Sequence, residues 1–264
     1  FSHVERHWLD DYVLFASLNH EQASPWYEWS PELRDREPMA MAEARRRLQD
    51  ERRFHAFCQF IFQRQWQALR RYAREKGVEI VGDMPIYVGL NSADVWAHRH
   101  LFCLDECGQP SMVAGAAPDR FFDERGQRWG NPVYDWAAMA DDGYQWWVDR
   151  VAQLLRLVDQ VRIDHFRGFE SFWALPAQEL DARRGYWLPG PGQALSNALR
   201  EHFPDLPLLV EDLGFITPEV EQLRDDNQLP GMAVLQFAFG SRERANPYYP
   251  HLIRENQLVY TGTH

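Results

Sequence analysis

The sequence has few cysteines, no long apolar run and no excess of positive charge, and each of these absences excludes a class of protein. Its 264 residues carry a formal net charge of -11. This charge argues against a nucleic-acid partner, because phosphate binding needs clustered lysine and arginine. No apolar run approaches the roughly 18 residues of a membrane helix, and no basic-then-apolar signal pattern is present. We therefore expect neither a nucleic-acid nor a membrane partner.

Cysteine and metal motifs are equally scarce. Cys58, Cys103 and Cys107 are odd in number and lack the spacing of a disulfide framework, so we expect reduced thiols and a cytoplasmic location. The sequence contains no His-Glu-x-x-His zinc motif, no phosphate-binding glycine loop and no Gly-x-Ser-x-Gly elbow. We expect no metal and no organic cofactor, since the chemistry described next needs only carboxylates.

Three short, mostly apolar runs each lead into an acidic residue. Residues 80–82 precede Asp83, residues 161–163 precede Asp164, and residues 208–210 precede Glu211. If these runs are neighbouring strands of one parallel sheet, their carboxyl ends lie on one face and the acidic side chains converge there. Two converging carboxylates indicate acid/base or nucleophilic chemistry, with cleavage of a glycosidic bond as the leading case.

Strands and helices alternate along the chain, which predicts a parallel sheet covered by helices. The expected strands are 78–81, 161–163, 206–210, 232–237 and 257–260. The expected helices are 37–76 (one helix or two), 143–160, 192–202 and one that begins at Pro218. The intervening region 84–142 is rich in proline, glycine and aromatic residues, and we expect a mostly irregular, functional loop region there.

The predicted fold class is α/β, with residues 1–264 forming the central part of a (β/α)8 TIM-barrel domain. A closed barrel needs eight strands, and only five are expected here. We therefore interpret the chain as a segment of a longer protein that lacks strands at both ends. Such a segment on its own is expected to be poorly active.

Asp164 is the candidate nucleophile. Arg162 lies two positions earlier, so on a strand both side chains point to the same side. A guanidinium beside the carboxylate favours its ionised form, which a nucleophile requires. The alternative is an ordinary arginine–aspartate pair at the end of the strand.

Glu211 is the candidate general acid/base, because burial at the end of an apolar strand raises the pKa of a carboxyl group. Its neighbour Asp212 is expected to point away and to serve as a cap or a hydrogen-bonding group. Asp83 could bind a sugar hydroxyl or orient Arg162, or it could be a turn residue before Pro85.

Trp129 is expected to stack on a sugar, since its glycine-flanked setting resembles a loop more than a core. Other tryptophans, such as Trp66, Trp146 and Trp147, stand at helical spacing and are expected in the core.

Six segments together resemble the 4-α-glucanotransferase family, the amylomaltases or disproportionating enzymes, which are related to α-amylases. They follow the family's order over almost the whole chain. The segments are Gly82–Val88 with Ser92–Trp96, Gly126–Pro132, Arg162–Glu170, Glu211–Gly214 with Ile216–Val220, Pro230–Met232 with Val234–Ala238, and Tyr260–His264.

The resemblance implies a (β/α)8 barrel, of which this chain holds the third to seventh strands. It implies Asp164 as nucleophile and Glu211 as acid/base in a retaining transfer between maltooligosaccharides or other α-1,4-glucans. It also implies sugar contacts from Asp83, Arg162, His264 and Trp129, and we add His165 beside the nucleophile. The family's third catalytic carboxylate follows the histidine of Thr-Gly-Thr-His, and this sequence stops at that histidine. The alternatives are an α-glucan hydrolase on the same site and a glucan-binding segment without turnover.

Overall fold

Five parallel strands follow one another in chain order. The computed structural model describes residues 1–119, 123–239 and 246–262. One sheet has the order β1-β4-β7, and β8 and β9 form a second parallel pair. The N–H of Val210 at the end of β7 donates to the carbonyl of Pro230 just before β8 (2.9 Å), which places the two groups side by side. The parallel strands are β1 (Val81–Pro85), β4 (Gln160–Asp164), β7 (Leu208–Val210), β8 (Gly231–Val234) and β9 (Gln257–Tyr260).

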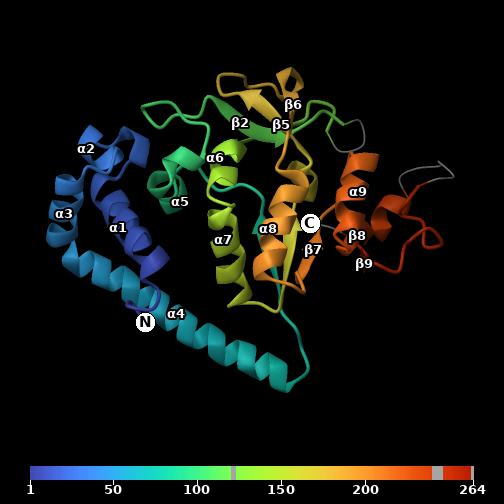
Figure 1. Cartoon of the computed structure of the whole chain (residues 1–264), viewed down its shortest axis with the longest axis horizontal. Helices are drawn as coiled ribbons and strands as arrows, with labels where there is room; N and C mark the ends of the chain where they lie inside the picture. The colour runs from blue at the N-terminus through green and yellow to red at the C-terminus, as the bar shows by residue number, and fades with distance from the viewer. Residues whose placement is uncertain (120–122, 240–245, 263–264) are drawn as a thin grey trace.

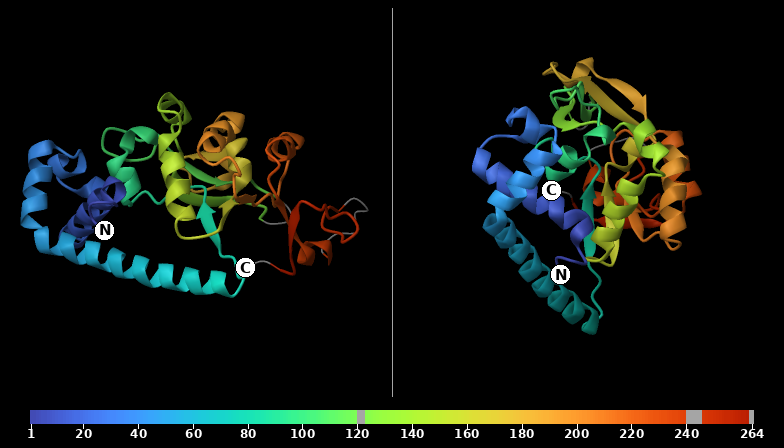
Figure 2. Two further views of the ribbon diagram at one scale, coloured as in Figure 1. Left: turned by 60° about the horizontal axis from the view of Figure 1, so that its bottom comes forward. Right: turned by 60° about the vertical axis from the view of Figure 1, so that its left-hand side comes forward.

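The helices lie on two sides of these strands (Figures 1 and 2). Helices α7, α8 and α9 run along one side, each preceding the parallel strand that it leads into, as a βα alternation requires. The long helix α4 runs along the opposite side. The helices are α1 (Arg6–Gln22), α2 (Pro31–Arg34), α3 (Pro38–Arg47), α4 (Gln49–Glu75), α5 (Ala93–Ala97), α6 (Trp136–Asp141), α7 (Gln145–Leu155), α8 (Gly192–His202) and α9 (Pro218–Asp226).

A four-stranded antiparallel sheet lies beyond the end of the parallel strands at which β7 finishes (Figure 1). Its order is β3-β2-β5-β6. The members are β2 (Met112–Ala116), β3 (Gln127–Pro132), β5 (Ser171–Pro176) and β6 (Tyr186–Pro189). The region 84–142, expected to be mostly irregular, thus supplies two of these strands, β2 and β3. Strand β2 pairs with β5 far along the chain, in the register Val113↔Leu175, and such a non-local pairing leaves no local sequence pattern.

Most expected strands are present, with shifted ends. The strand expected at 78–81 begins only at Val81, because the N–H of Ile80 bonds to the Asp159 carboxylate instead of to a strand. Strand β7 starts at Leu208, since Leu206 has a positive φ of 38°. The strand expected at 232–237 ends at Val234 and becomes a 3-10 helix. Strand β9 has the predicted bounds.

The helix predictions were confirmed in outline. The stretch 37–76 forms two helices, α3 and α4, and Gly77 closes the second with φ at +67°. Helix α7 begins two residues later than predicted, because Gly143 and Tyr144 both have positive φ. Helix α8 matches its predicted bounds. Thr217 occupies the N-cap position of α9, although its side chain makes no capping hydrogen bond.

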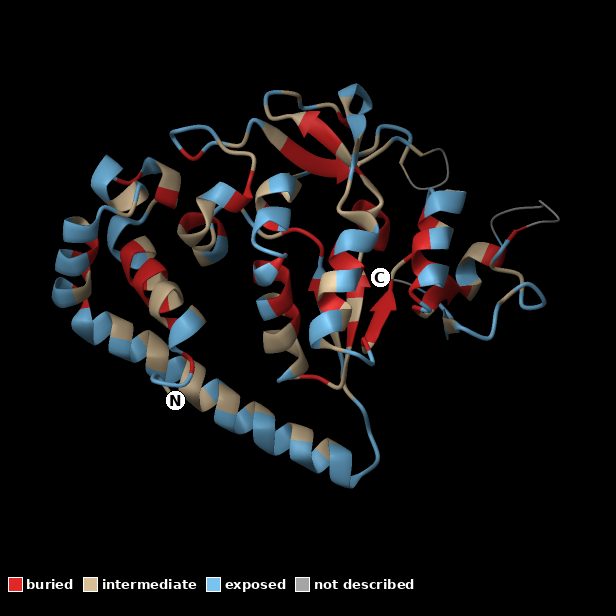
Figure 3. Ribbon diagram, in the orientation of Figure 1, coloured by how far each residue is buried: buried red, intermediate tan, exposed pale blue. Residues whose placement is uncertain are grey.

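Helix α4 is covered less than most of the molecule (Figure 3). Trp146 and Trp147 on α7 are buried as predicted, but Trp66 on α4 is only partly covered. No residue of α4 is buried, and Phe54 and Phe57 remain more than half exposed. The apolar side chains of α4 thus do not enter the core of the described residues. No helix in this part of the chain is both long and apolar enough to cross a membrane.

Asp159 joins the end of α4 to the parallel sheet. Its Oδ1 accepts hydrogen bonds from Arg70 (2.9 Å) and Arg74 (2.8 Å), and its Oδ2 accepts from the backbone N–H of Ile80 (3.0 Å). The Ile80 N–H and the two guanidinium groups hold the pKa of this carboxyl well below its ordinary range. One side chain therefore fixes the helix end and the start of β1 together.

Replacing Asp159 with asparagine should lower the free energy of unfolding of the full-length protein by about 1–3 kcal/mol, since two charge-assisted bonds are lost. A depressed folded-state pKa gives stability above the unfolded pKa that disappears as pH falls through the folded value. The difference between the parent and D159N should therefore shrink on acidification. Urea unfolding near pH 7 and at the lowest pH that keeps the protein folded measures this, with the exposed Asp205→Asn as control. A pH-independent difference would contradict the assignment.

Candidate active site

Arg162 links two of the predicted acidic residues at the end of the parallel sheet. Its Nη1 donates to Asp83 Oδ1 (2.6 Å) on β1, and its Nη2 donates to Asp164 Oδ1 (2.8 Å) at the end of β4. The pairing register places Asp83 opposite Arg162 on the neighbouring strand. The Arg162 side chain is mostly covered (17% exposed), whereas Asp164 is 41% and Asp83 61% exposed. The guanidinium thus holds two carboxylates that stay accessible from solvent.

Glu211 directly follows β7 and is held by two backbone N–H groups. His165 N donates to Glu211 Oε2 (2.8 Å), and Leu213 N donates to Oε1 (2.9 Å). Burial raises the pKa of Glu211 from 4.5 to about 7, against the lowering effect of these two bonds, and the negative charge of Asp164 raises it further. Because His165 directly follows Asp164, the bond from its N–H brings the two carboxylates to the same place. This pKa direction matches the sequence prediction.

Asp212 points away from this place, also as predicted. It forms a buried ion pair with Arg224 of α9 (2.6 Å), and its Oδ1 accepts from the N–H of Met232 (2.7 Å). A Cβ at Gly231 would come within 2.5 Å of the Asp212 carboxylate, so only glycine fits there. Two adjacent acidic residues therefore have different tasks: Glu211 faces the site, and Asp212 fastens β7 to β8 and α9.

His165 and Trp129 lie together beside Glu211. Their rings meet edge to face with centroids 4.8 Å apart. His165 has a left-handed backbone (φ 56°), and burial, with a smaller contribution from the Arg167 charge, lowers its pKa to about 4. Its Nε2 is buried and has no hydrogen-bond partner among the described residues. At neutral pH the ring is therefore uncharged. Trp129 belongs to strand β3 and not to an irregular loop, which corrects the prediction, yet it stays 36% exposed.

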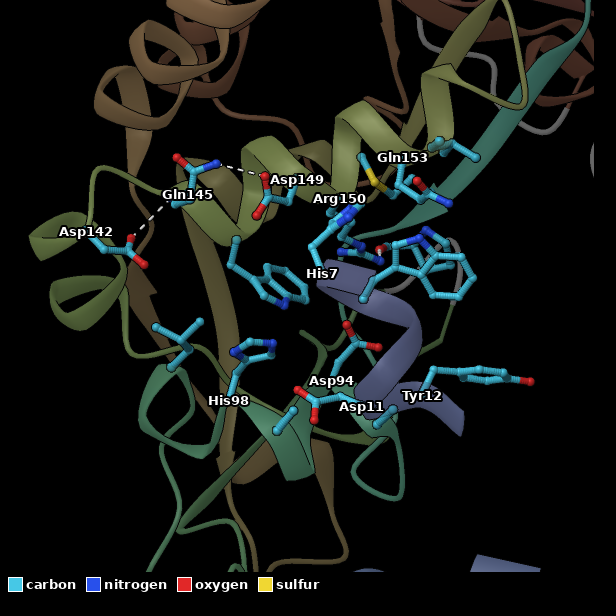
Figure 4. A pocket seen from close by; sticks show the side chains of 18 of the residues that line it. His7, Asp11, Tyr12, Asp94, His98, Asp142, Gln145, Asp149, Arg150 and Gln153 are labelled. Atoms are coloured by element: carbon cyan, nitrogen blue, oxygen red, sulfur yellow. Dashed lines mark hydrogen bonds between the residues drawn. The ribbon is translucent and has the colours of Figure 1, made fainter. Parts of the chain in front are cut away.

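A further cavity of about 550 Å³ lies against β1 (Figure 4). Side chains from α1, α5 and α7 line it, among them Asp11, Asp94 and Asp149, and it reaches Asp83. Neither Asp164 nor Glu211 lines this cavity. Within the described part of the chain, no group of three or more His, Cys, Asp or Glu side chains is arranged to hold a metal ion.

Comparison with known sequences decides the family. The profile of the 4-alpha-glucanotransferase family, glycoside hydrolase family 77, matches residues 1–264. This chain belongs to that family. The 4-alpha-glucanotransferase of Thermus thermophilus is 49% identical over the whole of this chain and 53% of its own length. The Aquifex aeolicus 4-alpha-glucanotransferase is 46% identical over 98% of this chain and 53% of its own length. The chain thus spans about half the length of these curated relatives.

The family assignment extends to the structure. Amylomaltase from Streptococcus agalactiae, solved in complex with acarbose, superposes with a TM-score of 0.94 at 35% identity. The match covers 98% of this chain and 52% of the amylomaltase chain. The α/β architecture with both parallel and antiparallel sheets is therefore that of an amylomaltase.

Most of the site residues that were predicted from the sequence lie in one place. Asp83, Arg162, Asp164, His165, Glu211 and Trp129 are joined by the contacts above. His264 lies outside the described residues. The sequence analysis assigned no role to Arg167, which stands three positions after Asp164 within the segment Arg162–Glu170. Only the structure shows that this arginine is 4% exposed, and a buried guanidinium needs partners.

The raised pKa of Glu211 makes a prediction about stability. The folded protein holds this proton more tightly than the unfolded chain does. The contribution of protonated Glu211 to folding stability is therefore full below pH 4.5 and is lost as pH rises through about 7. Glu211→Gln removes this dependence. The melting temperature of E211Q minus that of the parent should therefore increase over this pH range and level off above it.

Thermal unfolding at a series of pH values measures this difference. Glu201→Gln, on the exposed face of α8, changes the same charge elsewhere and should give a flat difference. A flat difference for E211Q as well would show that Glu211 has an ordinary carboxyl environment.

Proposed function

We propose that the protein containing this chain is a retaining 4-α-glucanotransferase that transfers α-1,4-glucan segments between maltooligosaccharides. One observation carries the proposal: Glu211, whose pKa is raised to about 7, accepts a hydrogen bond from the residue next to Asp164. A protonated and an ionised carboxyl group side by side are what glycosidic cleavage requires. The family membership supports the same reaction.

In the proposed reaction, Asp164 attacks the anomeric carbon while Glu211 donates its proton to the departing glycosidic oxygen. A glycosyl ester on Asp164 results. Glu211, now a base, takes the proton from the 4-hydroxyl of an acceptor glucan, and the attack of that oxygen restores Asp164 and forms a new α-1,4 bond. The two carboxyl groups should then stand about 5 to 5.5 Å apart, as in retaining enzymes.

The remaining site residues bind the sugar in this proposal. Arg162 keeps Asp164 oriented through the bond at 2.8 Å, and Asp83, bonded to the same guanidinium, accepts from a sugar hydroxyl. His165 offers its unpartnered Nε2, and Trp129 offers an exposed ring face. We also include His264. The family's third carboxylate would come from the part of the protein beyond these residues.

We further propose that β1, β4, β7, β8 and β9 are five consecutive strands of a (β/α)8 barrel, with residues 1–264 as the central part of that catalytic domain. Their parallel order supports this, as do the acidic residues at the ends of β4 and β7 and within β1. The antiparallel sheet, part of which comes from region 84–142, then lies over the face where substrate binds.

The first test is product analysis of the full-length protein incubated with maltotriose. Glucose together with a ladder of longer maltooligosaccharides is the expected result, because an acceptor glucan then outcompetes water. Glucose and maltose without longer products would instead establish a hydrolase that uses the same two carboxylates.

Substitution of the two carboxyl groups tests their roles. Glu211→Gln should lower kcat by at least about 100-fold, the loss typical of removing a general acid/base, and Asp164→Asn, which removes the nucleophile, should lower it at least as much. Both should keep measurable affinity for maltooligosaccharides by calorimetry. Asp212→Asn is the matched control: it should lower stability, because it weakens the buried pair with Arg224, more than it lowers kcat in the folded protein. Unchanged turnover in E211Q would favour a binding module over an enzyme.

The pH dependence follows from the same group. Glu211 must carry a proton to assist departure of the leaving group, so kcat/KM for maltotriose should fall as pH rises above about 7. Initial rates across the neutral range measure this limb. A basic limb that begins well below neutrality would contradict the assignment of the acid.

A further inference from the structure

Two aromatic rings outside the carboxylate site remain open to solvent. Phe215, four residues after Glu211, is 58% exposed, and Trp187 on the edge strand β6 is 36% exposed. Their rings lie nearly parallel, at an interplanar angle of 27° with centroids 6.4 Å apart. Large apolar rings that share one exposed place are uncommon outside binding surfaces.

A buried cation fixes these two rings. Arg167 is only 4% exposed, and its guanidinium carbon lies 3.8 Å from the Trp187 ring centroid and 5.6 Å from that of Phe215. It donates to the carbonyl of Phe215 and to Ser171 Oγ (3.0 Å). Burying a guanidinium is costly unless such bonds compensate it. The structure thus places a desolvated charge where it orients two exposed rings.

The pair is continuous with the proposed active site. Arg167 stands two residues after His165, whose N–H holds Glu211 and whose ring touches Trp129. On the other chain segment, Leu213 N holds Glu211, and Phe215 follows two residues later. The segments that carry Arg167 and Phe215 therefore both begin at the carboxylates, and Trp187 joins them through its contact with Arg167.

The pair lies apart from Trp129. Trp129 lies on β3 and Trp187 on β6, the two edge strands of the order β3-β2-β5-β6, and three inter-strand spacings place the backbones of these edges about 14 Å apart. The pairing register aligns Trp187 with Trp173, Gly115 and Arg128, so Trp187 and Trp129 project from opposite faces of the sheet. A sugar at Trp187 is therefore remote from one at Trp129.

We propose that Trp187 and Phe215 form a second sugar-stacking platform, which binds units of a long α-1,4-glucan remote from the bond that is cleaved. This inference rests on the proposed function. Flat aromatic faces offer apolar contact to the carbon-bearing faces of pyranose rings, and rings held by Arg167 need little ordering when the sugar binds. The platform therefore favours long glucans over short ones.

The test measures affinity in the full-length protein carrying Glu211→Gln, so that ligands are not consumed. Calorimetric titration compares maltoheptaose with maltotriose for that protein and for the same protein with Phe215→Ala or Trp187→Ala added. The Phe215 variant is the primary one, because its exposed side chain can be removed with little effect on folding. Leu180→Ala, an 86% exposed apolar residue between β5 and β6, is the control.

The expected result is about a tenfold higher Kd for maltoheptaose in each platform variant, equivalent to a loss of about 1.4 kcal/mol in binding free energy. The Kd for maltotriose should change far less, and Leu180→Ala should change neither. Unchanged maltoheptaose affinity would overturn the platform. Equal losses for both sugars would overturn it too, since they would show a general distortion around the carboxylates. A variant with altered thermal unfolding and unaltered affinity would make the rings a packing surface for the rest of the protein. Failure of the proposed function would look different: no sugar binding with the platform intact, and no turnover by the unaltered protein.

Discussion

Three hydrogen bonds between the ends of β4 and β7 determine where the acidic groups of this site stand. Glu211 N donates to the carbonyl of Ile163 (2.9 Å), Phe166 N donates to the carbonyl of Glu211 (3.1 Å), and His165 N reaches the Glu211 carboxylate. The segment that follows Asp164 is therefore hydrogen-bonded both to the backbone and to the side chain of Glu211. The left-handed turn at His165 makes this path available, and Gly168 permits it, since a Cβ there would come within 2.6 Å of Ile86. The relative position of two side chains thus follows from backbone bonds, which are less mobile than side-chain contacts.

Environment, and not residue type, separates the roles of the acidic groups. Asp164 and Asp83 share one guanidinium and remain open to water. Glu211 is mostly desolvated, and its two backbone donors do not offset the cost of burying a charge, so it keeps its proton near neutral pH. Asp212 is buried as well, but Arg224 neutralises it. The alternation of side chains along an extended segment is enough to send Glu211 and Asp212 into these opposite surroundings.

The features that local patterns control were predictable from the sequence. Apolar runs ending in acidic residues gave the strands and their functional ends, and the two-residue spacing of Arg162 and Asp164 gave their contact. The antiparallel sheet was not predictable, because β2 finds its partner β5 only after the chain has passed through β4. For the same reason Trp129 looked like a loop residue, although it lies on β3. The exposure of α4 was missed for another reason. Apolar residues at helical spacing show that one face of a helix is apolar, but they do not show whether the described residues pack against that face.

The two sheets carry different kinds of side chain. The ends of the parallel strands hold Asp164 and Glu211, which neighbouring backbone bonds fix in place. The edge strands β3 and β6 each have one unpaired side within the described sheet, which leaves Trp129 and Trp187 partly exposed. His165 and Arg167, two residues apart, join the systems, because one contacts Trp129 and the other Trp187. A shift of either edge strand would therefore act on the 3-10 segment after Asp164. The rings of Trp129 and Trp187 thus contact side chains of the same segment whose backbone N–H holds the Glu211 carboxylate.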